Sequence, residues 1–333
     1  SWLVLWLNQL GAEVHGYALA PNTNPSLFLT ANVADCLVSN TLADIRDLPL
    51  LSKTIDTIQP EIVFHLAAQP LVRYSYQDPV ETYSTNVMGT VNLLEAVRQT
   101  SSVKAVVNVT TDKCYENREW VWPYREDEAL GGHDPYSSSK ACSEIITAAY
   151  RRSFMEQQGI ALATARAGNV IGGGDWSEDR LIPDFLKSLD REETLVIRSP
   201  EAIRPWQHVL EPLSGYIRLA ECLAEASAKY VGSWNFGPAE EDARSVAWIV
   251  EHLASLHNSE DWRVDNNKQV HEANYLKLDS SKARSQLGWK PKWNLKIALD
   301  KTLQWHLAWK NGDDMRAQCL MQIQAYQDHQ KHH

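Results

Sequence analysis

Tyr136 and Lys140 are the residues of this 333-residue sequence whose types and spacing point most directly to chemistry. They lie four positions apart at the start of a long amphipathic segment, so in a helix they share one face. A nearby ammonium group stabilises a phenolate and lowers the phenol pKa from about 10 toward neutral, which makes tyrosine a usable general base. The alternative is an ordinary pair of surface residues on a helix, and the spacing alone leaves that alternative open.

A second polar cluster, Thr111, Asp112 and Lys113, comes directly after the apolar run of residues 104–110. If that run is a strand of a parallel sheet, the cluster lies at the carboxyl edge of the sheet, where α/β proteins bind their ligands. Tyr136 and this cluster can then face one pocket. The alternative for Asp112 and Lys113 is a surface ion pair at the end of a strand.

Apolar runs and amphipathic segments alternate along the first half of the sequence. Strands are predicted at residues 14–19, 62–68, 104–110 and 160–166, and helices at residues 2–10, 79–100 and 136–157. The run 62–68 is apolar except for His65, which predicts a strand buried on both faces and parallel pairing. The alternation predicts an α/β protein with a doubly wound parallel (Rossmann) sheet. After Ile171 the rhythm changes to a glycine-rich loop and mixed short elements, which predict a smaller mixed substrate-binding lobe.

Composition excludes several classes of protein. With 44% hydrophobic and 22% charged residues the chain can bury a large core. A net charge of −10 would repel nucleic acid and anionic membranes, so any bound phosphate must be met by a local basic cluster. No apolar stretch reaches the roughly 20 residues of a membrane helix. The five scattered cysteines lack zinc or redox spacing, which predicts no metal site, reduced thiols and a cytoplasmic protein.

Several further motifs occur together with these clusters in a consistent order. They are residues 65–69, 86–90, 166–172, 204–209 and 271–275. With them the sequence resembles, over essentially its whole length, the extended short-chain dehydrogenases/reductases, and among these the sugar-nucleotide 4,6-dehydratases. It looks most similar to the CDP-glucose 4,6-dehydratases, which share residues 112–115, 172–176 and 204–208, whereas dTDP-glucose relatives usually carry Glu where Lys113 stands.

This resemblance implies an NAD-dependent hydro-lyase acting on a nucleoside-diphosphate hexose, most closely CDP-glucose. Tyr136, assisted by Lys140, would take the proton of the 4-hydroxyl, and Thr111 would hydrogen-bond around the 4-oxygen. Lys113 would remove the C5 proton while a protonated Asp112 donates to the departing 6-hydroxyl. Hydride removed from C4 would return at C6. A lysine serves as a base only if burial or neighbouring positive charge depresses its pKa.

The resemblance also assigns binding residues. Cofactor-binding residues would be Asp44, Ile45, Leu66, Ala67, Ala68, Gln69, Asn86, Thr110, Tyr136, Lys140 and Ala167. Substrate-binding residues would be Asn169, Arg180, Leu181, Arg204, Gln207, His208 and Tyr275. Arginine suits diphosphate because its planar fork matches phosphate oxygens. Most of these residues have a structural alternative, such as a helix cap at Asp44, a turn at Asn169 or a surface position at Arg180.

The resemblance to this family also predicts the domain boundaries. Residues 1–168 would form the NAD-binding domain, to which residues 207–236 return, and residues 169–206 and 237–333 would form the nucleotide-sugar lobe. The family begins with a strand and a Gly-x-x-Gly-x-x-Gly turn that receives the pyrophosphate. The present sequence starts just after that turn, so we expect the natural protein to have ~20 further residues, enough for one strand and a turn.

Other inferences stay open at this point. No acidic residue ends the second strand, where Ala18, Leu19 and Ala20 stand, so a preference for NAD over NADP rests on the resemblance. A nucleotide-sugar 4-epimerase would share Tyr136 and Lys140 without needing Asp112 and Lys113. A non-catalytic nucleotide-binding protein would need none of these residues. The resemblance further implies a homodimer formed through the helix that bears Tyr136, and a place in deoxysugar biosynthesis of the O-antigen and lipopolysaccharide kind.

Overall fold

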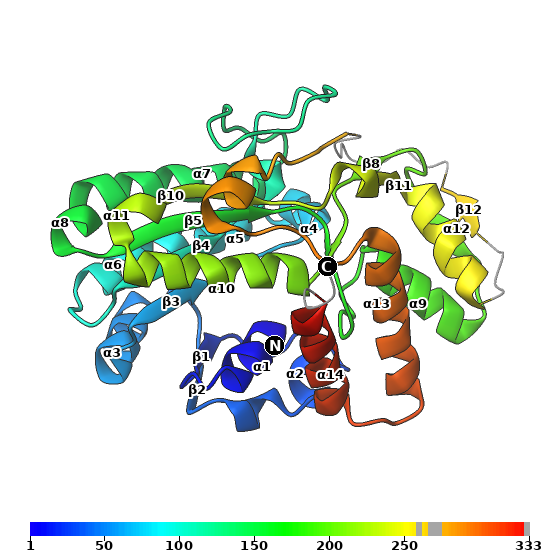
Figure 1. Cartoon of the computed structure of the whole chain (residues 1–333), viewed down its shortest axis with the longest axis horizontal. Helices are drawn as coiled ribbons and strands as arrows, with labels where there is room; N and C mark the ends of the chain where they lie inside the picture. The colour runs from blue at the N-terminus through cyan, green and yellow to red at the C-terminus, as the bar shows by residue number, and fades with distance from the viewer. Residues whose placement is uncertain (258–261, 266–274, 330–333) are drawn as a thin grey trace.

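A parallel four-stranded sheet forms the centre of the larger lobe. The computed structural model describes residues 1–257, 262–265 and 275–329. The sheet contains β3 (Ile62–His65), β4 (Ala105–Val109), β5 (Ala161–Ala167) and β10 (Gly232–Phe236), in the order β10-β5-β4-β3. All neighbouring pairs are parallel. The predicted α/β fold with a parallel sheet is confirmed (Figure 1).

Both faces of this sheet are covered by helices because its strands are apolar on both sides. Ala105 and Val107 of β4 pack in the core beneath α10 (Leu210–Glu225). Val106 points to the other face and packs in the core that includes α6 (Gly89–Arg98). Figure 1 shows α10 and α7 on opposite sides of these strands. The alternation of single side chains between two cores explains why residues 105–107 of β4 are all apolar.

A second, two-stranded parallel sheet contains β1 (His15–Ala18) and β2 (Ser39–Leu42). Within the described ranges no strand bonds this sheet to β3, so the doubly wound sheet is present in two pieces. The predicted first helix is confirmed as α1 (Trp2–Gln9), which packs against α14 (Met315–Asp328).

Two sequence predictions need correction at β3. The strand ends at His65, so residues 66–68 are not part of it. Ile62 is 39% exposed, and the strand is not buried on both faces as predicted. The reason is its position, because β3 is an edge strand of the four-stranded sheet in the described part of the chain. Leu66, which follows it, is 46% exposed.

The two predicted long helices are confirmed as continuous helical stretches that each contain a π-helical turn. The first comprises α5 (Pro79–Tyr83), η2 (Ser84–Met88) and α6, and the second comprises α7 (Pro135–Tyr150), η4 (Arg151–Met155) and α8 (Glu156–Gln158). Asp134 caps α7 by accepting a hydrogen bond from the Ser137 backbone N–H, which fixes where the helix bearing Tyr136 begins.

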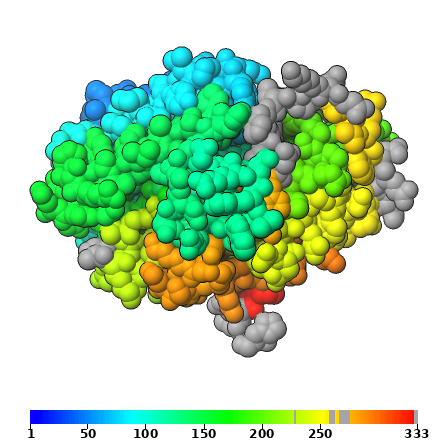
Figure 2. Space-filling view, turned by 90° about the horizontal axis from the view of Figure 1, so that it is seen from above, coloured from blue at the N-terminus to red at the C-terminus, as the bar shows by residue number. Residues whose placement is uncertain are grey.

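The smaller lobe packs around a separate apolar core. Its elements are α9 (Leu181–Arg191), β7 (Leu195–Ile197), β8 (Ile203–Arg204), β11 (Arg244–Ser245), α12 (Val246–His257), β12 (Trp262–Val264) and α13 (Leu295–Lys310). Figure 1 places α9 and α12 on the side of this lobe that is remote from β4. Figure 2 shows the later part of the chain packed against the earlier part. The division into domains at residues 168, 206 and 236 stays a prediction.

Shorter elements complete the chain. They are α2 (Leu27–Thr30), η1 (Val33–Cys36), α3 (Leu48–Ile58), α4 (Val72–Gln77), η3 (Asp112–Cys114), β6 (Val170–Ile171), β9 (Gln207–His208), α11 (Ser227–Tyr230), η5 (Glu240–Asp242) and η6 (Ala283–Leu287). β6 pairs with β9 in parallel. This pairing joins the segment that follows β5 to the segment that follows Arg204, so two stretches distant in sequence meet beside the carboxyl edge of the sheet.

Candidate active site

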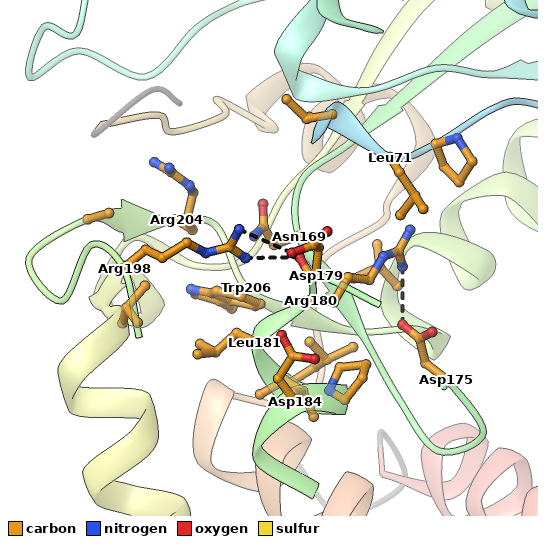
Figure 3. Close-up of a pocket in the computed structure, with 18 of the residues that line it drawn as sticks. Leu71, Asn169, Asp175, Asp179, Arg180, Leu181, Asp184, Arg198, Arg204 and Trp206 are labelled. Carbon is orange, nitrogen blue, oxygen red and sulfur yellow. Dashed lines mark hydrogen bonds and ion pairs between the residues drawn. The ribbon is translucent and has the colours of Figure 1, made fainter. Parts of the chain in front are cut away.

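A cavity of ≈330 Å³ opens where β4 and β5 end and the smaller lobe begins (Figure 3). Eight of the predicted site residues line it: Thr111, Asp112, Lys113, Tyr136, Asn169, Arg180, Leu181 and Arg204. These residues come from several separate segments of the chain. The structure therefore brings together the predicted acid–base cluster and the predicted arginines in one cavity.

Asp112 stands at the carboxyl end of β4 in a short 3₁₀ turn that Thr111 caps. The Thr111 hydroxyl accepts a hydrogen bond from the Lys113 N–H at 3.3 Å and donates one to Asp112 Oδ1 at 3.0 Å. Asp112 is 1% exposed, and burial raises the pKa of its carboxyl group. Its second oxygen has no hydrogen-bond partner among the described residues. A buried carboxyl of raised pKa can keep its proton and donate it.

Tyr136 and Lys140 both lie on the buried side of α7, as their spacing predicted. Tyr136 is 8% exposed, and burial raises the pKa of its phenol to about 12, although a hydrogen bond with Thr111 opposes that rise. Lys140 is 6% exposed, and burial lowers the pKa of its ammonium group to about 8. The phenol and the ammonium are thus both shifted toward their uncharged forms.

Lys140 and Tyr136 have different hydrogen-bond partners in this structure. Lys140 Nζ donates a hydrogen bond to the Val109 carbonyl oxygen at 3.2 Å. The groups that lower the Tyr136 pKa are the Thr111 hydroxyl and, by charge, Arg180. Lys140 is thus directed to the end of β4, and its predicted assistance to the Tyr136 phenol stays a prediction.

A buried ion pair that the sequence interpretation missed lies behind Thr110. Arg166 and Glu144 form a 2.7 Å salt bridge and are both buried. Burial raises the pKa of Glu144, but the Arg166 guanidinium and several hydrogen bonds outweigh it and hold that pKa below its usual value. The Thr110 hydroxyl donates to Glu144 at 2.5 Å. The predicted cofactor-binding Thr110 therefore uses its side chain to anchor the end of β4.

Gly168 and Asn169 hold the segment after β5 against the segment that carries Arg204. A Cβ on Gly168 would lie 2.4 Å from the Pro205 ring, so only glycine permits this approach. The Asn169 carbonyl accepts a hydrogen bond from the Gln207 N–H at 2.9 Å. This close contact fixes Asn169 and Arg204 in the same wall of the cavity.

Four arginine side chains line the cavity, and Figure 3 labels Arg180, Arg198 and Arg204. Arg180 pairs with Asp175 at 3.1 Å, and Arg204 is buried in the wall. Two further arginines, Arg73 and Arg198, were missed in the sequence. They line the cavity from α4 and from the end of β7. No local sequence motif identifies Arg73 and Arg198, because only the packing of the two lobes brings these residues together.

Asp179 joins these two additional arginines. Its Oδ1 lies 3.4 Å from Arg73 Nη1 and 3.3 Å from Arg198 Nη1. Asp179 has a φ of 58°, in the left-handed region, and it directly precedes Arg180. The Asp179 carboxylate therefore lies between two guanidinium groups. Because guanidinium groups bind phosphate oxygens well, this is the part of the cavity best suited to a phosphate.

Three predicted substrate-binding residues lie outside the cavity wall. Gln207 is buried and donates to the Phe236 carbonyl at 2.8 Å. His208 is 0% exposed, with its ring 6.0 Å from that of Trp2 and 5.0 Å from that of Trp293. These two side chains pack the interior, so the predicted direct contact with substrate finds no support in this geometry.

Tyr275 is the third of these residues. It forms a β-bridge with Ile203, and its ring lies 5.3 Å from Lys277 Nζ. It does not line the cavity, although it stands beside the strand that ends at Arg204. The rest of its motif, residues 271–274, lies outside the described residues.

Eight further predicted cofactor residues do not line this cavity; all follow or end a strand except Asn86, which lies in η2. They are Asp44, Ile45, Leu66, Ala67, Ala68, Gln69, Asn86 and Ala167. Asn86 exchanges two hydrogen bonds with the Gln69 backbone, at 2.7 and 3.0 Å, and so fixes the loop after β3. Asp44 forms a salt bridge with Arg46, and the Ile45 side chain packs in the core beside Gly89.

Other structural findings concern metals, cysteines and membranes. Within residues 1–257, 262–265 and 275–329, no cluster of three His, Cys, Asp or Glu side chains is arranged to hold a metal. All five cysteines are free thiols. None of the described helices is both long and apolar enough to cross a bilayer.

Comparison with known proteins gives matches along most of the chain. Residues 1–302 match the family described as GDP-mannose 4,6 dehydratase. A CDP-glucose 4,6-dehydratase of Salmonella typhimurium is 54% identical over 332 residues, covering 98% of this chain and 92% of that protein. A probable dTDP-glucose 4,6-dehydratase of Sinorhizobium fredii is 28% identical, covering 81% of this chain and 78% of that protein.

Solved structures share the fold. A dTDP-glucose 4,6-dehydratase of Bacillus anthracis in complex with NAD has a TM-score of 0.77 at 21% identity, covering 94% of each chain. A UDP-glucose 4-epimerase of Thermotoga maritima with UDP-glucose has a TM-score of 0.79 at 22% identity, covering 93% of this chain and 95% of that one. From the sequence matches, this chain belongs to the GDP-mannose 4,6 dehydratase family.

Proposed function

We propose that this protein is an NAD-dependent hydro-lyase that converts CDP-glucose to CDP-4-keto-6-deoxyglucose with loss of water. The observation that carries the proposal is the buried Asp112, an acid of raised pKa that lines one cavity with Lys113 and Tyr136. The 54% identity to the CDP-glucose 4,6-dehydratase of Salmonella typhimurium supports the choice of reaction and substrate.

The residues beside this cavity fit a nicotinamide cofactor. Lys140 is buried, and in the described part of the chain it uses one of its three N–H donors, on Val109. Its other donors suit the hydroxyls of a ribose. The small Ala67 and Ala68 leave room after β3, in a loop that Asn86 holds in place. These four residues and Tyr136 would hold NAD, which supplies the acceptor and donor of hydride when bound.

Tyr136 would remove the proton of the 4-hydroxyl, and Thr111 would position the 4-oxygen. Deprotonation of a phenol whose pKa is about 12 requires stabilisation of the phenolate. Two groups already act in that direction, the Thr111 hydroxyl and the positive charge of Arg180. A 4-keto group then acidifies the neighbouring C5–H, which is the proton removed in the next step.

Asp112 and Lys113 would carry out the elimination. Lys113 takes the C5 proton, the C6–O bond breaks, and Asp112 donates its proton so that water leaves. Return of hydride to C6 and of a proton to C5 completes the 4-keto-6-deoxy sugar. A 4-epimerase, which shares this fold, has no leaving hydroxyl to protonate. The buried acid beside Lys113 therefore favours dehydration over epimerisation.

The proposed reaction is tested by incubating the protein and NAD with CDP-glucose, UDP-glucose or dTDP-glucose and recording product masses. We expect CDP-glucose to lose the mass of one water and to give a 4-keto-6-deoxy sugar. An epimerised sugar of unchanged mass would contradict dehydration. Dehydration of dTDP-glucose or UDP-glucose in preference to CDP-glucose would contradict the assigned nucleotide.

We also propose that the protein is a cytoplasmic homodimer that supplies a deoxysugar for cell-surface polysaccharide of the O-antigen kind. Apolar side chains exposed along α5, η2 and α7 support a dimer through these helices; they include Val80, Met88 and Ile145. The five free thiols support a reducing compartment. Light scattering of Ile145→Asp against the parent protein tests the dimer, and an unchanged dimeric mass would contradict this interface.

A further inference from the structure

Three kinds of side chain line the cavity. Acid–base residues stand at the carboxyl end of β4, and the arginines form a second group. The elements α9, β7 and α12 of the smaller lobe contribute the apolar side chains Leu186, Leu195, Ile197 and Val246. A nucleoside-diphosphate hexose has three matching parts: a hexose, a diphosphate and a nucleoside. The apolar side chains of the smaller lobe therefore suit the nucleobase.

One charged side chain, Asp184, lines this cavity from the first turns of α9 (Figure 3). It is one of four lining carboxylates. The other three have partners in the wall: Asp112 with Thr111, Asp175 with Arg180, and Asp179 with Arg73 and Arg198. The Asp184 carboxylate has no hydrogen bond or ion pair with the described residues. It is the lining acid whose acceptors remain available to a ligand.

The surroundings of Asp184 leave its carboxylate poorly solvated. The side chain is half-buried, and burial raises the pKa of its carboxyl group. Among the nearby charges, Lys187 and Arg198 favour the ionised form, whereas Asp179 and Glu178 act with burial against it. An ionised carboxylate only accepts hydrogen bonds. A ligand that presents an N–H at this end of the cavity would therefore be stabilised, and one that presents a carbonyl oxygen would be repelled.

We propose that Asp184 selects the nucleobase by accepting a hydrogen bond from the exocyclic amino group of cytosine. This inference rests on the proposed function and adds the residue that distinguishes its substrate from other nucleotide sugars. Cytosine presents an N4 amino donor at the position where thymine, like uracil, presents the O4 acceptor. Opposite O4, the carboxylate would meet another acceptor, so specificity includes repulsion of the wrong base.

The apolar neighbours argue for the base over the ribose as the group that Asp184 meets. Leu195 and Ile197 of β7 are both buried and give the cavity an aliphatic wall, against which a base ring can pack. A ribose would present hydroxyl groups that Asp184 could also accept. The two possibilities make different predictions, since CDP and UDP carry the same ribose whereas only CDP presents an N4 amino group.

The test compares Asp184→Asn with Asp56→Asn, the same loss of one negative charge at an exposed residue of α3 outside the cavity. Affinities for CDP and UDP are measured by calorimetry, and kcat/KM is measured for CDP-glucose and UDP-glucose. The parent protein is expected to bind CDP more tightly than UDP. Asp184→Asn should narrow that preference by about 10-fold, the size of one base-edge hydrogen bond, because an amide can also donate to O4. Asp56→Asn should leave the preference unchanged.

Other outcomes would overturn the inference. An equal loss of CDP and UDP affinity in Asp184→Asn would place the carboxylate on the ribose. An unchanged preference, or a parent protein that binds CDP and UDP alike, would remove Asp184 from base selection. If thermal melting shows that Asp184→Asn is unfolded, Asp184→Ser takes its place in the same comparison. Failure of the parent protein to dehydrate any nucleotide glucose would instead contradict the proposed function, which the binding measurement does not depend on.

Discussion

The two ends of the cavity are built in different ways. At the catalytic end, Asp112 and Tyr136 are almost fully buried, and each is placed by a local device, a capped 3₁₀ turn after β4 and a capped first turn of α7. In the middle and outer part, Arg73, Asp179 and Arg198 come from distant segments and remain partly exposed. Reactive groups are thus held by neighbouring backbone, whereas recognition groups are held by contacts between lobes.

This difference predicts effects of different size. Charges and dipoles interact more strongly in a buried, poorly solvated site than in water. Exposed ion pairs are weakened by solvent and are typically worth about 0–1 kcal/mol. Substitutions at the catalytic end should therefore lower kcat by factors of about 100 to 1,000, whereas substitutions among the arginines should mainly raise KM.

The largest effect is expected for Tyr136→Phe, which removes the hydroxyl that accepts the substrate proton. We expect kcat for CDP-glucose to fall about 10³-fold, within the range of general acid–base catalysis. Mass spectrometry of the product gives the rate. Tyr74→Phe, at a partly exposed tyrosine, is the matched control. A Tyr136→Phe enzyme within a few-fold of the parent would show that the phenol is not the base.

Asp112→Asn should lower kcat about 100-fold by removing the proton donor for the leaving hydroxyl. Oxidation at C4 would still take place, so the absorbance of reduced nicotinamide should build up before product appears. If reduced nicotinamide did not accumulate and kcat were unchanged, Asp112 would have no part in elimination. Asp56→Asn, on the solvent side of α3, controls for the charge change.

The same variant gives a stability prediction whose sign follows from the raised pKa of Asp112. A folded-state pKa above the unfolded value means that the proton stabilises the fold at low pH, and that this contribution is lost as pH rises through the folded pKa. Asp112→Asn should therefore melt at a higher temperature than the parent at pH 8, with a smaller difference at pH 4. If Asp112→Asn instead melted at a lower temperature than the parent at pH 8, burial of the ionised Asp112 carboxylate would not destabilise the fold.

Arg204→Ala should raise KM for CDP-glucose by about 10- to 100-fold while kcat changes less, because a hydrogen bond to a charged group contributes about 1.5–3 kcal/mol. Arg218→Ala, at a side chain outside the cavity, is the control. A fall in kcat with KM unchanged would move Arg204 from binding to catalysis and weaken the contrast between the two ends.

The smallest effect is expected for Asp179→Asn, which removes the carboxylate between Arg73 and Arg198. The Asp179 carboxylate competes with the substrate diphosphate for these two arginines. Its removal should therefore lower KM and the inhibition constant of pyrophosphate about 2- to 5-fold each, because a partly exposed ion pair contributes little free energy. A rise in both constants would show that Asp179 instead holds the arginines in place for the substrate.

The contrast also explains what could be predicted from the sequence. Thr111, Asp112 and Tyr136 were predicted because they follow a strand or share a helix face, so local pattern and sheet topology fix their geometry. Arg73 and Arg198 were not, because only the packing of two lobes brings them together. His208 was assigned to substrate on motif resemblance, whereas its neighbours Trp2 and Trp293, distant in sequence, make it part of the interior.

Similar limits apply to the fold. The alternation of apolar and amphipathic segments was enough to predict the parallel sheet and its covering helices. The exposure of β3 could not be predicted, since its sequence is apolar whether it lies at the edge or in the centre of a sheet. The π-helical turns at η2 and η4 likewise have no signature in the apolar pattern.

The most direct test of the proposed dehydration is to follow deuterium from C4 of labelled CDP-glucose during turnover in ordinary water. We predict that the deuterium appears at C6 of a product lighter than the substrate by one water, without loss to the solvent. Deuterium found in the solvent, or retained at C4 of a sugar of unchanged mass, would contradict internal hydride transfer and the dehydratase assignment.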